Sequence, residues 1–319
     1  MTLTQLTYIV AVDKYRNFVR AAQSCQVTQP TLSMQIQKLE EEINLSIFDR
    51  SEHPIKVTKT GALLIEQARS VLGEQKKFQD LVSELKDETR GELRIGVIPT
   101  LAPYLMPRFI KEFSETNPDL KIYVEELQTQ NLLRKLNQGD LDLGLLVSPI
   151  EMAGITIQPL FYEPFLVYVS ENSPYIKQSK IDQKDLNSNE LWLLSEGHCF
   201  REQSLLLCKN RKKTTDQNKN LLFESGSLET LKRMVDQESG FTLLPYLAAQ
   251  DIKNTKRLKE FSGNTPTREV SLAYQNNFRK EKIKKSLVES ILQGIPKEIG
   301  KPNARSVQVI DLPMGTGNS

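Results

Sequence analysis

The chain has 319 residues, a length that fits two or three domains, and its 42 basic and 40 acidic residues leave a net charge of +2. No apolar run approaches the about 20 residues of a membrane span, and the first residues lack the features of a signal peptide. Three cysteines exclude a disulfide scaffold, so we expect a reducing, cytoplasmic location. The balanced charge neither requires nor excludes nucleic acid, and any basic footprint must be local.

Residues 1–58 are predicted to be helical and to contain a helix-turn-helix. A short helix over 18–24 is followed by a turn at 25–27, with Cys25 in a structural role. Thr28 is a plausible N-cap of the next helix, and Pro30 is tolerated in a first helical turn. The residues at helical spacing that we expect to face the core of this helix pair are Leu32, Ile36, Leu39 and Ile43.

The opposite face of the second helix carries small, amide and basic side chains. Such a face suits a helix that enters the major groove, where Ser and Gln bond to base edges and Lys and Arg contact phosphates. The residues predicted to contact DNA are Gln29, Pro30, Thr31, Ser33, Met34, Gln37, Lys38 and Arg50. The segment "IKVTKTG" is a candidate wing strand. A solvated helical hairpin is the alternative, because charges balance over 1–58 and the run of Glu40 to Glu42 must face away from phosphate.

Residues 59–88 are predicted to form one long linker helix. Its apolar positions follow helical spacing and its other positions carry mixed charges. The apolar residues are Leu63, Leu64, Ala68, Val71, Leu72, Phe78, Leu81, Val82 and Leu85. A second copy of this helix is the simplest partner for the stripe, so we expect a dimer.

From Gly91 onward, strand-like and helix-like segments alternate. This alternation predicts an α/β regulatory domain over 89–302 with a largely parallel sheet. It divides into lobe I, about 89–162 and 266–302, and lobe II, about 163–265, joined by crossing strands around a hinged cleft. The predicted fold is therefore an all-α winged helix-turn-helix followed by a two-lobed domain like the periplasmic binding proteins. Residues 303–319 have little periodicity and are predicted to be a mobile tail.

Several long motifs resemble a known family. The stretch "AAQSCQVTQPTLSMQIQKLEEEINLSIFDR" followed by "VTKTG" resembles the winged helix-turn-helix of LysR-type transcriptional regulators. More narrowly, "GVIPTLAPYLMP", "EGHCFREQ", Cys208, "SLETLKRMV" and "GFTLLP" resemble the hydrogen-peroxide-responsive members of that family. The resemblance spans nearly the whole chain. It implies DNA binding and a homotetramer, a dimer of dimers, on inverted-repeat sites in double-stranded promoter DNA.

The cysteine pair in "SEGHCFREQSLLLCKN" has three interpretations. Cys199 and Cys208 can be buried packing residues, as free cysteines often are. A metal site fits poorly, because structural zinc needs about four ligands and its cysteines usually lie two to four residues apart. We therefore expect neither metal nor cofactor. The third interpretation is a redox pair.

The redox interpretation has a physical basis. Cys199 follows a Gly turn and opens a helix-like run, and a helix N-terminus together with the Arg201 charge would lower its pKa. His198 can donate a hydrogen bond to the thiolate or to a peroxide oxygen, and Thr100 and Thr129 each begin a helix where a hydroxyl can orient peroxide. The family resemblance supports these two threonines and His198 as the peroxide pocket. Either threonine can instead be an ordinary N-cap.

The spacing of the cysteines predicts a switch. If 199–208 is one helix, its Cα atoms at the two ends lie roughly 13–14 Å apart, whereas a disulfide needs roughly 4.4–6.8 Å. We expect peroxide to oxidise Cys199 to a sulfenic acid, Cys208 to condense with it, and the helix to unwind at least partly.

The expected function is transcriptional control of the oxidative-stress response, and not enzymatic turnover. Double-stranded DNA, hydrogen peroxide, RNA polymerase and a cellular thiol reductant are the expected partners, and a membrane is not. Two alternatives stay open. One is a LysR-type regulator that senses a small organic effector in the cleft. The other is a thiol peroxidase, which would not need a helix-turn-helix.

Overall fold

The computed structural model describes residues 1–51, 54–85, 90–187, 190–208, 225–238, 240–299 and 308–309. The chain divides into two compact units, Met1–Glu88 with one apolar core and Thr89–Ser319 with two. Among the described helices, none combines the length and apolar character that crossing a membrane requires. The basic segment that follows Cys208 lies outside the described residues.

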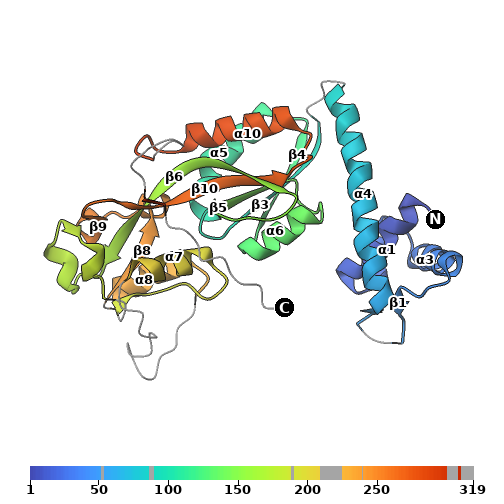
Figure 1. The fold of residues 1–319 in the computed structure, drawn as a ribbon, viewed down its shortest axis with the longest axis horizontal. Coiled ribbons are helices and arrows are strands. Elements are labelled where there is room, and N and C mark those ends of the chain that lie inside the picture. The colour runs from blue at the N-terminus through green and yellow to red at the C-terminus, as the bar shows by residue number, and fades with distance from the viewer. Residues whose placement is uncertain are drawn as a thin grey trace. The chain divides into compact units, whose positions relative to one another are not determined.

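The first unit is a winged helix-turn-helix followed by a long helix. Side-chain caps start its first three helices: Thr2 forms a capping box with Gln5, and Asn17 and Thr28 each accept a backbone N–H. Its elements are α1 (Leu3–Tyr15), α2 (Phe18–Ser24), α3 (Gln29–Ile43), β1 (Phe48–Asp49), β2 (Lys56–Val57) and α4 (Lys59–Leu85). The two strands pair antiparallel as a wing (Figure 1).

The core of this unit confirms the predicted helix face. Leu32, Ile36 and Leu39 are at most 1% exposed, and Ile43 is half-buried against the same cluster. Cys25, half-buried, also packs there. Gly61 lets the start of α4 pack closely against the backbone of Ile47, because a Cβ at this position would lie 2.1 Å from the Ile47 carbonyl oxygen. These contacts hold α3 against α1 and α2 and leave its other face outward.

The apolar residues of α4 divide into two sets. Ala68 is buried, and Leu64 and Leu72 pack against the core of the first unit. Leu63 and Phe78 are each 69% exposed, and Val71 and Val82 are also exposed. One side of the helix is thus covered within the unit, and an exposed apolar face remains.

The second unit is built on a sheet with the strand order β4-β3-β5-β10-β6-β9-β7, with β8 on β6 and β11 on β10. The strands are β3 (Gly91–Val97), β4 (Leu120–Glu126), β5 (Leu143–Ser148), β6 (Ile155–Val169), β7 (Lys180–Ile181), β8 (Phe241–Pro245), β9 (Leu258–Phe261), β10 (Pro266–Gln275) and β11 (Gln308–Val309). The helices are α5 (Ala102–Thr116), α6 (Thr129–Asn137), α7 (Cys199–Leu207), α8 (Leu228–Gln237), α9 (Tyr246–Ala249) and α10 (Glu281–Gly294), with short 3-10 turns at Pro174–Lys177, Gln183–Asp185 and Thr255–Arg257.

The sheet is parallel only in part. β3 pairs parallel with β4 and β5, as the alternating pattern predicts, whereas β10 runs antiparallel to β5 and β6, and β6 runs antiparallel to β8 and β9. Two further pairs, β7–β9 and β10–β11, are parallel, but the prediction of a largely parallel sheet is wrong for the middle of the sheet. The reason is that the long central strands β6 and β10 run in opposite directions. Their neighbours β5, β8 and β9 each pair antiparallel with one of them.

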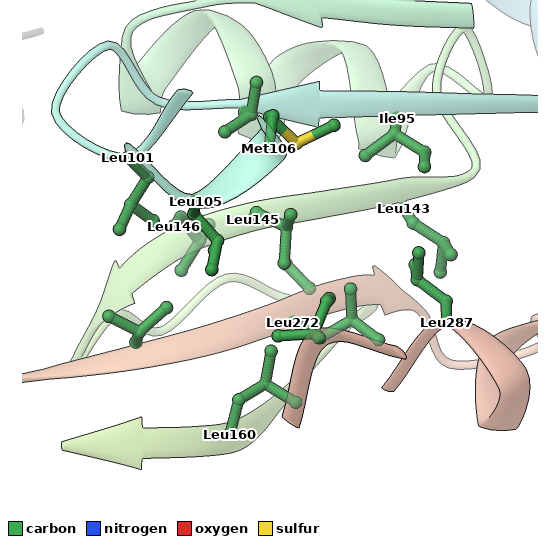
Figure 2. Packing of buried hydrophobic residues seen from close by; sticks show 14 of the residues in the cluster. Ile95, Leu101, Leu105, Met106, Leu143, Leu145, Leu146, Leu160, Leu272 and Leu287 are labelled. Carbon is green, nitrogen blue, oxygen red and sulfur yellow. The ribbon is translucent and has the colours of Figure 1, made fainter. Parts of the chain in front are cut away.

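Two apolar clusters lie along these crossing strands. The first core contains side chains from β3, β5, α5, α6 and α10, among them Ile95, Leu105, Leu145 and Leu287 (Figure 2). In Figure 1, α5 and α10 cover one face of the β3–β5 sheet and α6 lies on the other. The second core contains side chains from β6, β8, α7 and α8. Tyr104 of α5 packs against both cores.

The structure departs from the predicted pattern in the segment before α7. "ELWLLSEG" continues the strand alternation in sequence, but it contributes only single bridges, from Leu191 to Phe241 and from Leu194 to Ser225. Within the predicted tail, Gln308–Val309 forms β11 beside the start of β10, and the rest of 303–319 lies outside the described residues.

Candidate redox site and DNA-binding helix

Cys199 is the first residue of α7, and His198 is its N-cap. Gly197 turns the chain into the helix with a φ of +86°, a conformation that glycine adopts at little cost. The backbone N–H of Cys199 and its position at the positive end of the helix dipole favour a negative charge on the sulfur. Cys199 is half-buried, so it lies at the surface of the second core and not inside it.

Thr129 provides the one direct side-chain hydrogen bond to the sulfur among the described residues. Its Oγ1 lies 3.1 Å from the Cys199 Sγ, and the threonine is the first residue of α6. Leu132 and Leu136 of α6 belong to the first core, whereas Phe200 and Leu207 of α7 belong to the second. The site is thus assembled from both halves of the regulatory unit.

A buried ion pair lies behind the site. Arg268 of β10 donates to Glu163 of β6, with Nη2 2.8 Å from Oε2, and both side chains are at most 1% exposed. The same guanidinium donates to the hydroxyl of Thr100 at 3.0 Å and to its carbonyl oxygen at 3.1 Å. The other Glu163 oxygen accepts the N–H of Leu247 at 2.7 Å. Because the Thr100 oxygen accepts from Arg268, its own proton is available to another acceptor.

The pKa of the Cys199 thiol is raised, which corrects the expectation of a lowered pKa. Burial of the sulfur is the main cause. The hydrogen bond from Thr129, the N-terminal backbone N–H and the charge of Arg268 all act in the opposite direction. A helix N-terminus, visible in the sequence, therefore does not by itself determine the protonation state of a half-buried thiol.

The other two predicted pocket residues, His198 and Arg201, differ in how they relate to the sulfur. His198 is 8% exposed, and burial lowers the pKa of its imidazole, against the opposing influence of Glu126. The neutral imidazole can still donate one hydrogen bond. Arg201 donates to the Leu194 carbonyl oxygen at 2.7 Å, so its guanidinium holds the segment before α7. The positive charge that acts on the Cys199 sulfur is that of Arg268.

Cys208 lies at the far end of the same helix. It is the C-cap of α7, is 3% exposed within the second core, and burial raises the pKa of its thiol to about 12. Both cysteines are free thiols. The rise of about 1.5 Å per residue separates their Cα atoms by roughly 13–14 Å, which exceeds the span of a disulfide. The prediction of one helix between the cysteines is confirmed.

The outward face of α3 carries the residues predicted to contact DNA. Gln29, Thr31 and Lys38 are exposed, and Met34 is 49% exposed. The further members Pro30 and Gln37 are exposed as well, and Gln37 donates to Glu41 at 3.0 Å.

Arg50 and Ser33 belong to a small network beside that face. Arg50 donates to the Glu40 carboxylate at 2.9 Å and to the Ser33 hydroxyl at 3.5 Å, and it stacks over Phe18. The other oxygen of Glu40 accepts the backbone N–H groups of residues 47 and 48. Glu40 therefore joins α3 to the wing through both of its carboxylate oxygens. These bonds explain how one residue of the acidic run at 40–42 faces away from DNA phosphate.

Sequence reasoning missed three residues of the redox site. Arg268 opens the strand-like segment "REVSLAYQ" and Glu163 opens "EPFLVYVS", and opposite charges in two otherwise apolar segments were a usable signal. Gln203 lies one turn after Cys199, is fully buried, and its carboxamide has no hydrogen-bond partner within the described part of the protein.

Comparison with known proteins places the chain in a class. Residues 3–62 match the bacterial regulatory helix-turn-helix proteins of the lysR family, and residues 86–294 match the LysR substrate binding domain. The chain therefore belongs to the LysR family of transcriptional regulators, and the predicted winged helix-turn-helix with its α/β regulatory domain is confirmed.

Within that family the relatives are specific. The "Hydrogen peroxide-inducible genes activator" of Haemophilus influenzae is 36% identical over 304 residues, covering 92% of this chain and 100% of the relative. The "DNA-binding transcriptional dual regulator OxyR" of Escherichia coli K12 is 40% identical over 248 residues, covering 78% of this chain and 80% of the relative. A solved full-length OxyR variant from Pseudomonas aeruginosa is 34% identical with a TM-score of 0.76, covering 92% of this chain and 98% of that one.

Proposed function

We propose that this protein is an OxyR-like transcriptional regulator, an activator of oxidative-stress genes that senses hydrogen peroxide at Cys199. The observation that carries the proposal is the thiol at the start of α7, 3.1 Å from the Thr129 hydroxyl, in a chain with a LysR-family helix-turn-helix. Its similarity to relatives named for hydrogen-peroxide-inducible genes supports the same signal.

The chemistry begins with the Cys199 thiolate. Its sulfur attacks one peroxide oxygen, the O–O bond breaks, and the products are a sulfenic acid and hydroxide, which takes up a proton to become water. In this proposal Thr100 and Thr129 donate to the peroxide oxygens, which the bond from Arg268 to Thr100 and the Thr129–Cys199 contact support. His198 and the Gln203 amide, which has no hydrogen-bond partner among the described residues, are further polar groups along α7. The charge of Arg268 favours the thiolate that starts the reaction.

The second step is condensation with Cys208. Its thiol displaces the hydroxyl of the sulfenic acid, giving a disulfide and water. Because α7 holds the two Cα atoms roughly 13–14 Å apart, the disulfide requires α7 to unwind and Cys208 to leave the second core. Two arrangements of one segment then form a bistable element, which a thiol reductant returns to the helical state.

The output is a change in DNA contact. We infer that α3 enters the major groove of inverted-repeat promoter sites and that the exposed apolar face of α4, with Leu63 and Phe78 each 69% exposed, pairs with a second copy. A dimer of dimers would carry the change in the regulatory unit to the spacing of the DNA-binding units and so to RNA polymerase. Such a protein works in the cytoplasm, where promoter DNA and thiol reductants are found.

The two alternatives that the sequence left open are disfavoured by the similarity to relatives named for hydrogen-peroxide-inducible genes and by the LysR helix-turn-helix. A LysR-type regulator of a small organic effector would leave both cysteines idle. A thiol peroxidase would turn over peroxide, and it would not need the LysR helix-turn-helix, which matches residues 3–62.

The deciding experiment is a promoter footprint of Cys199→Ser and Cys208→Ser with and without peroxide. We expect the peroxide-dependent footprint to vanish in Cys199→Ser and the Cys199 sulfenic acid to persist in Cys208→Ser. A Cys25→Ser variant is the matched control, because this cysteine packs in the first unit. A footprint change that survives in Cys199→Ser would remove that cysteine from the mechanism.

A further inference from the structure

The redox site depends on the alignment of two halves that have separate cores. Cys199 belongs to α7 on the second core, whereas Thr129 opens α6 on the first core. The sulfur-to-hydroxyl contact of 3.1 Å is a weak link for keeping two bodies aligned. A second polar link between the halves would fix their alignment without touching the sulfur.

Tyr104 and Glu229 make such a link. The Tyr104 hydroxyl of α5 donates to Oε1 of Glu229 in α8 at 2.8 Å, joining residues 125 apart in sequence. Lys232 donates to the same oxygen at 3.0 Å and to both oxygens of Asp251 at 2.8 and 3.0 Å. The Lys232 ammonium also lies 6.0 Å from the Tyr104 ring centroid. Glu229 is thus held by a cation of its own half while it accepts from the other half.

Tyr104 is also well placed along its own helix. It lies one turn after Thr100, whose hydroxyl is bonded to Arg268, and its ring packs against both cores. Burial and the Glu229 carboxylate raise the pKa of the Tyr104 phenol, so the hydroxyl keeps its proton and remains a donor. A rotation of one half against the other would break this bond and would also move Thr100 and Thr129 relative to the sulfur.

We propose that Tyr104 and Glu229 form a clasp between the two halves that positions Thr100 and Thr129 for the attack of Cys199 on peroxide. This inference rests on the proposed function and adds two positioning residues to it. Neither residue contacts the reacting atoms. Their effect is therefore on the reaction that needs the threonines, and not on the nucleophilicity of Cys199 once it is ionised.

The test compares two reactions of Cys199 in the full-length chain. Tyr104→Phe removes only the hydroxyl, and we expect the rate constant with hydrogen peroxide to fall about tenfold, because loosened geometry reduces the rate of a positioned reaction. Iodoacetamide reacts with the ionised thiol without orientation by either threonine, so its limiting rate at high pH, where Cys199 is fully ionised, should be unchanged. Both rates can be followed by mass spectrometry of the Cys199 peptide.

Tyr168→Phe is the matched control. Its hydroxyl donates to Asp236, which also binds Arg257, so the same tyrosine–carboxylate–cation group exists entirely within the second half. We expect this variant to keep the wild-type ratio of the two rates. A Tyr104→Phe protein with the wild-type ratio, or one in which both rates fall equally, would overturn the clasp.

A double variant checks that the two residues act together. Glu229→Ala removes the acceptor, while Lys232 keeps Asp251 and the Ala248 carbonyl as partners. We expect Tyr104→Phe to cause no further loss in the Glu229→Ala background, and independent, multiplying losses would contradict the clasp. If wild-type Cys199 reacts with peroxide no faster than Cys25, the proposed function fails and the clasp with it. If Cys199 reacts with peroxide faster than Cys25 in the wild type, and just as fast in Tyr104→Phe, the clasp alone fails.

Discussion

Replacing Thr129 by Val tests the electrostatics of the site most directly. The two side chains have the same shape, so the change removes one hydroxyl 3.1 Å from the Cys199 sulfur. When the sulfur is a thiolate it has no proton, and the hydroxyl must be the donor. A hydrogen bond to a charged group contributes about 1.5–3 kcal/mol. At 1.36 kcal/mol per pKa unit, roughly, its loss should raise the Cys199 pKa by about one to two units.

The assay is the pH dependence of alkylation by iodoacetamide in a chain whose other two cysteines are replaced by Ser. Below the pKa, the rate for Thr129→Val should be about 10- to 100-fold lower, because the thiolate is the reacting species. Thr242→Val is the control: this buried threonine donates to the Trp192 carbonyl at 2.9 Å. Superimposable titrations of Thr129→Val and its parent would show that the contact does not stabilise the thiolate, and the account of the site would be wrong.

Three further predictions concern stability and DNA binding. Arg268→Met strands the buried Glu163 carboxylate, and we expect a loss of about 3–5 kcal/mol in urea denaturation; a loss near zero would contradict a charged pair. Burial raises the pKa of Cys208 from 9.0 to about 12, so the unfolded chain loses this proton first as pH rises. Its contribution is complete below pH 9 and should fall by about 1.4 kcal/mol per pH unit between 9 and 12. Cys208→Ser should lack that part of the slope, and equal slopes would refute the assignment. Lys38→Ala should weaken promoter binding and reduce the salt slope by about 0.9, whereas Ser33→Ala should weaken binding with the slope retained. Unchanged affinity of both would disprove the placement of the recognition helix.

Short-range pattern was enough to identify the DNA-binding unit and the cysteine helix. The spacing of Leu32, Ile36 and Leu39 determines which side of α3 is buried, since side chains three and four residues apart share one face of a helix. The same reasoning placed Cys199 and Cys208 at opposite ends of α7, and the structure agrees. The N-cap at Thr28 is equally local, because a cap involves residues three apart.

Tertiary structure alone brought Arg268 and Glu163 to the redox site and its predicted residues together. Thr129 and Cys199 are 70 residues apart, Glu163 and Arg268 are 105 apart, and Thr100 and Arg268 are 168 apart. Glu163 and Arg268 meet because β6 and β10 pair antiparallel with these two residues opposite each other, and Thr129 meets Cys199 because the starts of α6 and α7 come together. The periodicity within one segment does not specify how two strands pair. The sequence therefore predicted Arg201 as the cation beside the Cys199 sulfur, whereas in the folded chain that cation is Arg268.

The protonation of Cys199 shows the same division. Its position at a helix start is a local property, and it favours the thiolate. The burial that raises the pKa comes from the meeting of α6, α7 and the two cores, which the sequence does not specify locally. The sequence identified Cys199 as the candidate reactive thiol and placed Cys208 at the other end of the same helix. The packing of the two halves determines how readily that thiol ionises, because desolvation is a property of the whole surroundings.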